Sequence, residues 1–365
     1  MRHFMDIPDF TVAELDKLME TAMDIKENPQ KYAHICDGKK IATLFFEPST
    51  RTRLSFESAM MELGGNVIGF SSASASSTTK GESVMDTIRT VGEYADIIAM
   101  RHPLEGASYA ASLRSVVPVI NAGDGGHCHP TQTLADLLTI KICNKRLDHL
   151  KIGVCGDLKY GRTVHSLIAA LSRYEGNQFV MISPKELQIP DYIKTEILNP
   201  RNIAWSTCDT IEECIGDLDI LYMTRIQKER FQDLAEYERL KNCFELNAKK
   251  MAYAKESMSV LHPLPRVKEI NVDVDDDPRA CYFKQVQNGK YMRMALILKL
   301  LSDKENNFCP KKARKEIVGK YTCANAKCVT AVETDLKQIC TCRDEKAQIY
   351  RCAYCESQIN TNNLD

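Results

Sequence analysis

Five consecutive polar residues, Ser49-Thr50-Arg51-Thr52-Arg53, have the chemistry needed to hold a phosphate group. They follow Pro48, and the apolar residues after them recur at helical spacing, so a helix is predicted to begin between Ser49 and Thr52. The N-terminus of a helix carries unpaired N–H groups and a partial positive charge, and Arg matches phosphate oxygens bidentately. Two arginines there oppose the helix dipole unless an anion is bound. The stretch therefore predicts a phosphate cradle.

Other polar residues follow predicted strands. Open α/β sheets bind ligands at the carboxyl ends of their strands, so these residues are candidates for the same site or a neighbouring one. They are Arg101 after the strand 96–100, His129 and Gln132 at a loop-to-helix junction, Arg162 after the strand 151–157, and Arg225 and Gln227 after the strand 219–223.

Cysteines are concentrated at one end of the chain, where seven of the fifteen lie beyond residue 308. Cys323 and Cys328, followed after twenty-three residues by Cys352 and Cys355, have the spacing of a four-thiolate zinc site. Cys340 and Cys342 are separated by a single residue, so we expect neither to ligate the same ion. A module this small needs the folding free energy that a structural metal supplies.

The elements that position these residues alternate between buried strands and amphipathic helices. This order predicts an α/β protein with two doubly wound parallel-sheet domains and a small C-terminal zinc-binding β-rich domain. The expected boundaries are 1–145, 146–285, a returning helix at 286–305, and 306–365. Thr11 is the expected N-cap of a helix over 11–27. The strand 116–120 is expected to end in a glycine-rich loop, 69–83 to be a mobile loop, and the acidic run 273–277 to be a solvated turn.

Composition excludes several classes of protein. The 365 residues carry a formal net charge of −1, which gives no general attraction to nucleic acid or membranes. No apolar run approaches the roughly 18 residues of a membrane span, and the first residues lack the apolar core of a signal peptide. We therefore expect a cytoplasmic protein with free or metal-bound thiols.

The segment Glu47-Pro-Ser-Thr-Arg-Thr-Arg53 resembles the carbamoyl-phosphate-binding signature of the transcarbamoylase family. His129-Pro-Thr-Gln132 is shared by that family, and the turn running from Gly156 to Leu167 is similar to that of its aspartate-type members, the aspartate carbamoyltransferases. Ornithine-type members carry His-Cys-Leu-Pro where this chain has His262-Pro-Leu-Pro265. The resemblance covers roughly residues 1–305, with the motifs in the same order.

The resemblance implies that the chain transfers the carbamoyl group from carbamoyl phosphate to the amine of L-aspartate, in de novo pyrimidine biosynthesis. The amine attacks directly, and neither a covalent nucleophile nor an organic cofactor is expected. Ser49, Thr50, Arg51 and Thr52 would hold the phosphate. Arg101 and His129 would join Thr52 near the carbonyl oxygen, and Gln132 would bind the carbamoyl amide. The side chains of Arg162, Arg225 and Gln227, with backbone carbonyls of Pro263 and Leu264, would bind aspartate and the reacting amide.

The resemblance also implies partners. In aspartate carbamoyltransferases a loop ending in Lys-Gly-Glu reaches a neighbouring subunit's active site with a Ser and a Lys, and Ser76 and Lys80 match those positions. Thr79 replaces a second lysine that relatives often carry. We therefore expect a homotrimer, or multiples of it, with shared active sites.

The cysteine-rich end resembles the zinc domain of the family's separate regulatory chain, here fused to the catalytic chain. The nucleotide-binding domain of that regulatory chain has no counterpart in the sequence, so we expect one structural Zn²⁺ per chain in a module that aids assembly without nucleotide control.

Two alternatives remain open from sequence. One is a transcarbamoylase for another amino acid. The other is a nucleic-acid-binding zinc ribbon on an inactive transferase fold, which should present a basic, aromatic-rich face. From Phe308 to Asp365, ten Lys and Arg residues stand against seven Asp and Glu, with few aromatics, which disfavours the second alternative.

Overall fold

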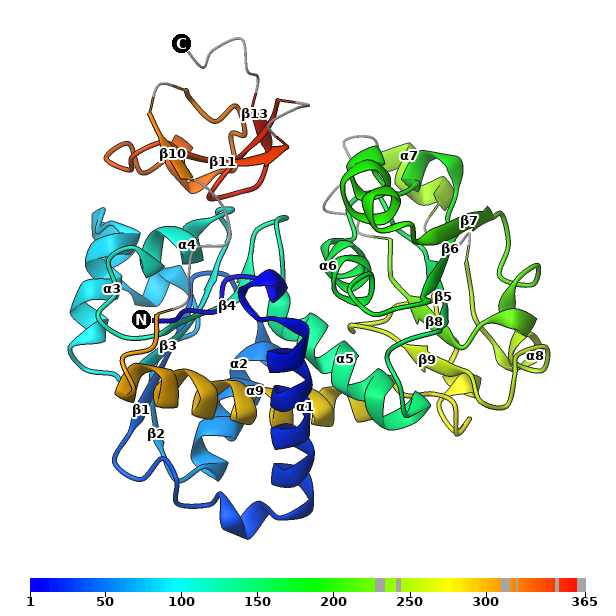
Figure 1. Cartoon of the computed structure of the whole chain (residues 1–365), viewed down its shortest axis with the longest axis horizontal. Coiled ribbons are helices and arrows are strands. Elements are labelled where there is room, and N and C mark those ends of the chain that lie inside the picture. Colours follow the sequence, from blue (N-terminus) through cyan, green and yellow to red (C-terminus); the bar gives the residue numbers. More distant parts are fainter. Residues whose placement is uncertain (227–233, 241–243, 310–315, 320, 345–347, 360–365) are drawn as a thin grey trace. The chain divides into compact units, whose positions relative to one another are not determined.

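The computed structural model describes residues 1–226, 234–240, 244–309, 316–319, 321–344 and 348–359. The chain forms two compact units (Figure 1). The first combines Met1–Thr131 with Lys290–Asp365, and the second is Gln132–Gly289. In the described part of the chain, no helix is both long enough and apolar enough to cross a membrane.

The first unit contains a parallel four-stranded sheet with the order β2-β1-β3-β4. Because all its strands run the same way, their carboxyl ends meet at one edge of the sheet. Its strands are β1 (Lys40–Phe45), β2 (Asn66–Phe70), β3 (Ile97–His102) and β4 (Val119–Asp124), and its shorter helices are α2 (Thr50–Glu62), α3 (Val84–Gly92) and α4 (Ala107–Ser112).

Two longer helices complete this unit. α1 (Val12–Glu27) begins as predicted, since Thr11 accepts a hydrogen bond from Glu14 N and Glu14 returns one to the Thr11 backbone. α9 (Tyr282–Glu305) begins four residues before the predicted returning helix, 286–305, ends where that helix was expected to end, and runs from the second unit into the first. Its last turns bind the N-terminal segment, because Asp303 lies 3.5 Å from Arg2.

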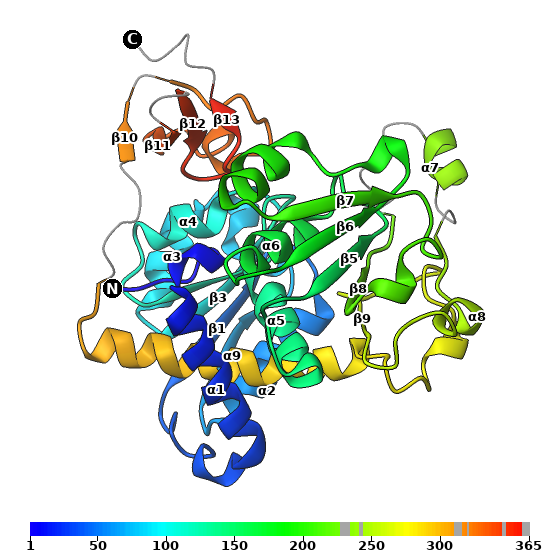
Figure 2. The same ribbon diagram turned by 45° about the vertical axis from the view of Figure 1, so that its right-hand side comes forward.

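The second unit contains a parallel five-stranded sheet with the order β7-β6-β5-β8-β9, whose strands β5, β6 and β7 run side by side in Figure 2. The strand β7 was not predicted, because most of its residues are exposed and it lacks an apolar run. The strands are β5 (Lys151–Cys155), β6 (Gln178–Ile182), β7 (Ala204–Cys208), β8 (Ile220–Met223) and β9 (Ser259–Leu261), and the helices are α5 (Pro130–Asn144), which enters from the first unit, α6 (Arg162–Leu171), α7 (Leu234–Leu240) and α8 (Ala248–Met251).

Three sequence predictions were wrong in detail. The strand β4 starts three residues late and continues through Asp124, because the polar residues of the expected loop are buried. The segment 69–83 is not structureless, since it contains 3-10 turns at Ala73–Ala75 and Ser77–Lys80. The acidic run is not merely solvated: Asp275 pairs with Arg266, and Asp277 lies 2.7 Å from Arg279.

The cysteine-rich segment forms an antiparallel sheet with the order β10-β11-β12-β13. Its buried side chains, Tyr354 among them, belong to the same apolar cluster as Met100 and Ala110 of the first unit. Polar contacts add to this packing, because Tyr109 OH donates to Glu316 and Val84 N donates to Glu333. The strands are β10 (Glu316–Val318), β11 (Ile339–Asp344), β12 (Ile349–Cys352) and β13 (Gln358–Ile359).

Candidate active site and metal centre

The predicted phosphate cradle lies at the N-terminus of α2, just after the carboxyl end of β1. Ser49 is the N-cap residue, and among the described residues no side-chain hydrogen bond caps the helix there. Thr50 and Arg51 are exposed, whereas Thr52 is buried. The N–H groups of the first turn can therefore meet an anion from solvent.

The two arginines of this turn have different surroundings. Arg53 lies 3.5 Å from Glu57 on the same helix, and Glu57 also accepts a hydrogen bond from Thr43 on β1. Arg51 is exposed at the mouth of the turn. The Arg51 side chain is thus accessible to an anion that approaches from solvent.

Thr52, Arg101 and His129 converge at the carboxyl edge of the first sheet. Thr52 Oγ1 lies 3.5 Å from His129 Nε2, and all three side chains are buried. Gly123 separates Arg101 from His129: a Cβ atom there would lie 3.1 Å from Arg101 Nη1 and 3.4 Å from His129 Cδ2. Its φ of +121° also favours glycine. Because Gly123 has no Cβ atom, the side chains of Arg101 and His129 can lie close enough together to donate to a single acceptor atom.

Sequence reasoning missed Glu47 and Arg293. Glu47 accepts a 2.7 Å hydrogen bond from Arg101 Nη2, which orients the guanidinium. Arg293 on α9 is buried, reaches Ser55 Oγ and Thr131 Oγ1, and stacks over Phe56. Glu47 could have been found because it opens the signature, whereas Arg293 lies in an apolar helix far along the chain.

The loop after β2 carries Ser76 and Lys80. Ser76 Oγ donates to Ala73 O at 2.9 Å, and Thr79 Oγ1 donates to Ser76 O at 3.0 Å. Lys80 is exposed at the end of its 3-10 turn. These hydrogen bonds give the loop a defined shape with its cation directed outward.

In the second unit, Arg162 and Arg225 follow neighbouring parallel strands, β5 and β8. Thr224 joins the two turns, because its Oγ1 accepts from Asp157 N and donates to Cys155 O. Arg162 opens α6 and is half-buried, as is Arg225. The structure therefore brings the two turns together. Gln227 lies outside the described residues.

Gln132 is held by Asp136 in the first turns of α5. Its Nε2 donates to Asp136 Oδ1 at 2.8 Å, and Asp136 Oδ2 accepts from Tyr222 OH at 3.1 Å. Asp136 also accepts from Gln285. This network fixes the orientation of the Gln132 amide. Asp136 bonds the amide nitrogen of Gln132 and not its carbonyl oxygen.

The segment after β9 is clamped by a buried hydrogen-bonded pair, His262 and Glu269. His262 Nε2 lies 2.8 Å from Glu269 Oε1, and His262 Nδ1 accepts from Leu264 N. Glu269 Oε2 accepts from Val267 N and Lys268 N. Burial raises the pKa of Glu269, but its interaction with His262 and its hydrogen bonds from backbone N–H groups together outweigh the effect of burial, and the net shift is downward. Leu264 adopts a left-handed φ of +52°, which such a clamp can hold.

The four predicted zinc ligands form one buried group. Their sulfur atoms all lie within 4.8 Å of one another, with Cys323 Sγ 3.5 Å from Cys355 Sγ and Cys328 Sγ 3.9 Å from Cys352 Sγ. Thr330 Oγ1 donates to Cys328 Sγ at 3.1 Å. Cys340 and Cys342 are not part of this group. Four sulfur atoms at this spacing could hold a metal ion.

Asp124, His127 and Cys128 form a second group of side chains that bind metals in other proteins. The Asp124 carboxylate, however, already accepts hydrogen bonds from Gly106 N, Asn121 Nδ2, Cys128 N and Cys128 Sγ and contacts His127 Nδ1. A carboxylate so occupied has no oxygen left for an ion. We read this group as a hydrogen-bonded network.

The fold and the site together define a two-unit α/β transferase with a phosphate-binding helix N-terminus. Two domain families match nearly all of residues 2–300. "Aspartate/ornithine carbamoyltransferase, carbamoyl-P binding domain" matches residues 2–142, and "Aspartate/ornithine carbamoyltransferase, Asp/Orn binding domain" matches residues 148–300.

Curated relatives and solved structures that resemble this chain are also carbamoyltransferases. An aspartate carbamoyltransferase catalytic subunit from Clostridium novyi is 62% identical over 300 residues, which are 82% of this chain and 98% of that protein. The catalytic subunit of M. jannaschii aspartate transcarbamoylase superposes with a TM-score of 0.78 at 47% identity, covering 84% of this chain and 99% of that chain. The Trypanosoma cruzi enzyme solved with N-(phosphonacetyl)-L-aspartic acid gives 0.77 at 36% identity, covering 82% and 95%. This chain belongs to the family of aspartate carbamoyltransferase catalytic subunits.

Proposed function

We propose that the chain transfers the carbamoyl group of carbamoyl phosphate to the amine of L-aspartate, giving N-carbamoyl-L-aspartate and phosphate. The observation that carries this proposal is the convergence of Thr52, Arg101 and His129 around Gly123, beside the helix N-terminus that opens with Ser49. The sequence identity to catalytic subunits supports the same activity. The Trypanosoma cruzi relative has been solved with carbamoyl phosphate and aspartate bound.

In the proposed mechanism the protein positions two substrates and stabilises developing charge. Ser49, Thr50, Arg51 and Thr52 hold the phosphate, while Thr52, Arg101 and His129 stabilise the carbonyl oxygen as the amine attacks. Gln132 binds the carbamoyl amide through its carbonyl oxygen. The tetrahedral intermediate collapses with loss of phosphate, which accepts the proton from the amine.

We propose that the turns after β5 and β8 bind the amino acid. The guanidinium groups of Arg162 and Arg225, together with Gln227, suit two carboxylates, whereas a cationic ornithine side chain would be repelled. Backbone carbonyls of Pro263 and Leu264, held by the His262–Glu269 pair, would accept hydrogen bonds from the amide and amine. This assignment favours aspartate over other amino acids.

We propose that Cys323, Cys328, Cys352 and Cys355 bind one structural Zn²⁺. A tetrahedral zinc with Zn–S bonds of about 2.3 Å requires sulfur atoms about 3.8 Å apart, and the two measured separations are 3.5 and 3.9 Å. Four thiolates fill the coordination sphere, so the ion would supply folding free energy rather than catalysis. The segment would then be a zinc domain fused to a catalytic chain.

We also propose that the working enzyme is a homotrimer, or a multiple of one, in which Ser76 and Lys80 complete the site of a neighbouring subunit. The outward position of Lys80 supports this assignment. Its product would serve de novo pyrimidine biosynthesis.

The proposed function is tested by incubating purified protein with carbamoyl phosphate and each of several amino acids. We expect carbamoylation of aspartate, with ornithine and other amino acids at background. Preferential carbamoylation of a different amino acid would favour the alternative transcarbamoylase.

A further inference from the structure

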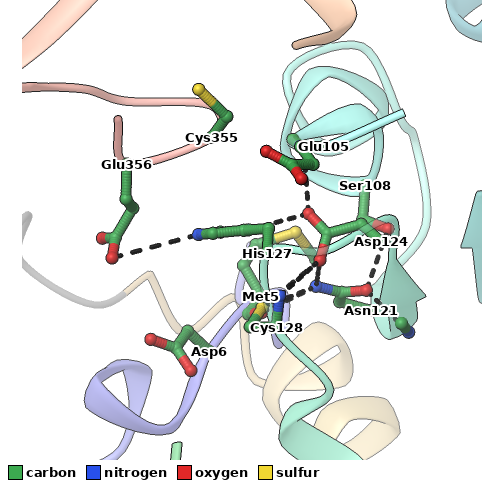
Figure 3. Close-up of polar contacts among 12 residues, drawn as sticks. Met5, Asp6, Glu105, Ser108, Asn121, Asp124, His127, Cys128, Cys355 and Glu356 are labelled. Atoms are coloured by element: carbon green, nitrogen blue, oxygen red, sulfur yellow. Dashed lines mark hydrogen bonds and ion pairs between the residues drawn. The ribbon is translucent and has the colours of Figure 1, made fainter. Parts of the chain in front are cut away.

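Both halves of the four-cysteine centre contact one short turn of the first sheet. This turn runs from Asp124 at the end of β4 to Cys128, and His129 is the next residue in the chain. We call residues 124–128 the catalytic turn because of this position. Its contacts with the cysteine-rich segment are drawn in part in Figure 3.

The first contact uses the Cys323–Cys328 half of the centre. Glu105 N donates to Lys327 O and Val329 N donates to Glu105 O, so the backbone on either side of Cys328 is paired with Glu105. The Glu105 carboxylate then bridges two segments, because Asn325 Nδ2 donates to its Oε2 at 2.6 Å and Gly126 N donates to its Oε1 at 3.1 Å. One carboxylate thus links this half of the centre to the catalytic turn.

The second contact uses the Cys352–Cys355 half. Glu356, directly after Cys355, pairs with Arg343 and lies 3.9 Å from His127 Nε2. His127 Nδ1 lies 2.9 Å from Asp124, so the imidazole stands between two carboxylates (Figure 3). Burial lowers the pKa of His127, but Cys128 and Asp124 outweigh it and the net shift is well upward. The His127 side chain thus links Glu356 of the module to Asp124 of the catalytic turn.

Close packing leaves little freedom at this junction. Gly106 N donates to Asp124 Oδ2, and a Cβ atom on Gly106 would lie only 2.5 Å from the backbone of Tyr354. Tyr354 itself stacks edge-on against Tyr109 with ring centroids 5.3 Å apart. A shift of the cysteine-rich segment would therefore be transmitted to Asp124.

Asp124 in turn fixes the residue before His129. Its Oδ1 accepts from Cys128 N at 3.2 Å, so the backbone enters His129 in a defined direction. His129 must place its imidazole beside Thr52 and Gly123 within tenths of an ångström to stabilise a developing charge.

We propose that Glu105, His127 and Glu356 are positioning residues for carbamoyl transfer, through which the four-cysteine module of a chain holds that chain's own His129 in place. The module then contributes to turnover as well as to stability and assembly. This proposal rests on the proposed function, because it assigns His129 to the reacting carbonyl.

The test compares Glu356→Gln and Glu105→Gln with the control Asp335→Asn, which removes a carboxylate from an exposed position of the same module. Glutamine at 356 removes the charge facing His127. Glutamine at 105 retains a single acceptor oxygen, although its two present partners are both donors. Turnover at saturating substrates, the inhibition constant of inorganic phosphate, bound metal and thermal unfolding are measured for each.

We expect kcat to fall about tenfold in both Gln variants, a loss typical of a small misplacement of a catalytic group. Phosphate should bind within about twofold of the wild-type value, because the cradle on α2 is untouched. The double variant should lose less than the product of the two single losses, since both residues act on one turn. Asp335→Asn should match the wild type.

Two results would overturn the inference. One is a kcat in both Gln variants equal to that of Asp335→Asn with metal content intact. The other is a loss of phosphate binding as large as the loss of kcat, which indicates general unfolding. A wild-type chain that makes no carbamoyl aspartate would instead contradict the proposed function.

Discussion

At the scale of single residues, burial and pairing separate side chains that look equivalent in the sequence. Arg51 and Arg53 are two positions apart in one helical turn, yet Arg53 is directed to Glu57 and Arg51 is exposed at the cradle. Arg101 is buried and oriented by Glu47. The arginines of the proposed phosphate site thus differ in exposure to solvent, and their substitution should have different consequences.

Replacing Arg51 with Ala should lower turnover by about 10² or more, because it removes a charge-assisted phosphate contact in a partly dry site. Steady-state assays over a range of carbamoyl phosphate concentrations measure the effect.

Arg53→Ala is the matched control for this substitution, since it removes the same group from the same helix turn. Its loss should be much smaller because Arg53 already pairs with Glu57. Near-normal turnover of Arg51→Ala at saturating carbamoyl phosphate would contradict the assignment of the cradle.

At the scale of elements, the sequence predicts what depends on local pattern. The start of α2, the Thr11 cap and the strands β1, β5 and β8 follow from hydrophobic periodicity and capping residues. The exposed edge strand β7 has no such pattern. The extension of β4 to Asp124 depends on tertiary burial of polar side chains, which one sequence does not reveal. Arg293 was missed for the same reason, because its partners are distant in the chain, whereas Glu47 opens the signature and could have been found.

The segment after β9 offers a prediction at this scale. Glu269→Ala removes the partner of His262 and leaves Val267 N and Lys268 N without their acceptor. We expect the free energy of unfolding to fall by about 1–3 kcal/mol, chiefly because the buried side chain of His262 loses its hydrogen-bond partner. Urea titration measures the change.

The KM for aspartate should rise in the same variant, because Pro263 and Leu264 lose their support. Lys268→Ala, at an exposed neighbouring position, is the control and should leave both quantities unchanged. Unaltered stability of Glu269→Ala would show that the clamp does not hold this segment.

At the scale of the whole molecule, two segments lie outside the two parallel sheets. They are the loop that carries the exposed Lys80 and the four-cysteine module. The loop is proposed to act on a neighbour, whereas the module contacts its own first unit. Assembly and metal binding therefore provide separate tests.

Mixing inactive Lys80→Ala protein with inactive Arg51→Ala protein should restore some activity after subunit exchange. A trimer containing both chains has one composite site with neither substitution, provided that Lys80 acts across the interface. Light scattering measures the molar mass of the hybrid, which should be that of a trimer. Each variant alone is the control. Fully exchanged hybrids without activity would place every site within a single chain.

Removing the proposed metal ion with a chelator should lower the thermal unfolding temperature and change the assembly size, since the four buried thiolates would lose the ion that they bind together. Metal analysis before and after treatment, and recovery on adding Zn²⁺, complete the measurement. An unchanged melting temperature and oligomer after metal loss would exclude the structural role.

CTP and ATP should leave the aspartate saturation curve unchanged, because the roles proposed for the four-cysteine module, to bind a metal and to support the catalytic turn, do not involve a nucleotide. Initial rates are measured over a range of aspartate with and without each nucleotide. A sigmoidal curve that shifts with CTP would contradict this expectation.

The return of α9 to the first unit has a consequence for synthesis on the ribosome. The first unit needs residues beyond 290, and Arg2 near its start rests against Asp303 and the ring of Phe308. The second unit is continuous in the chain, so it can close its core while the first still lacks a helix. The N-terminal half therefore emerges early and is completed late. During that interval the apolar surface that α9 will cover remains exposed to solvent.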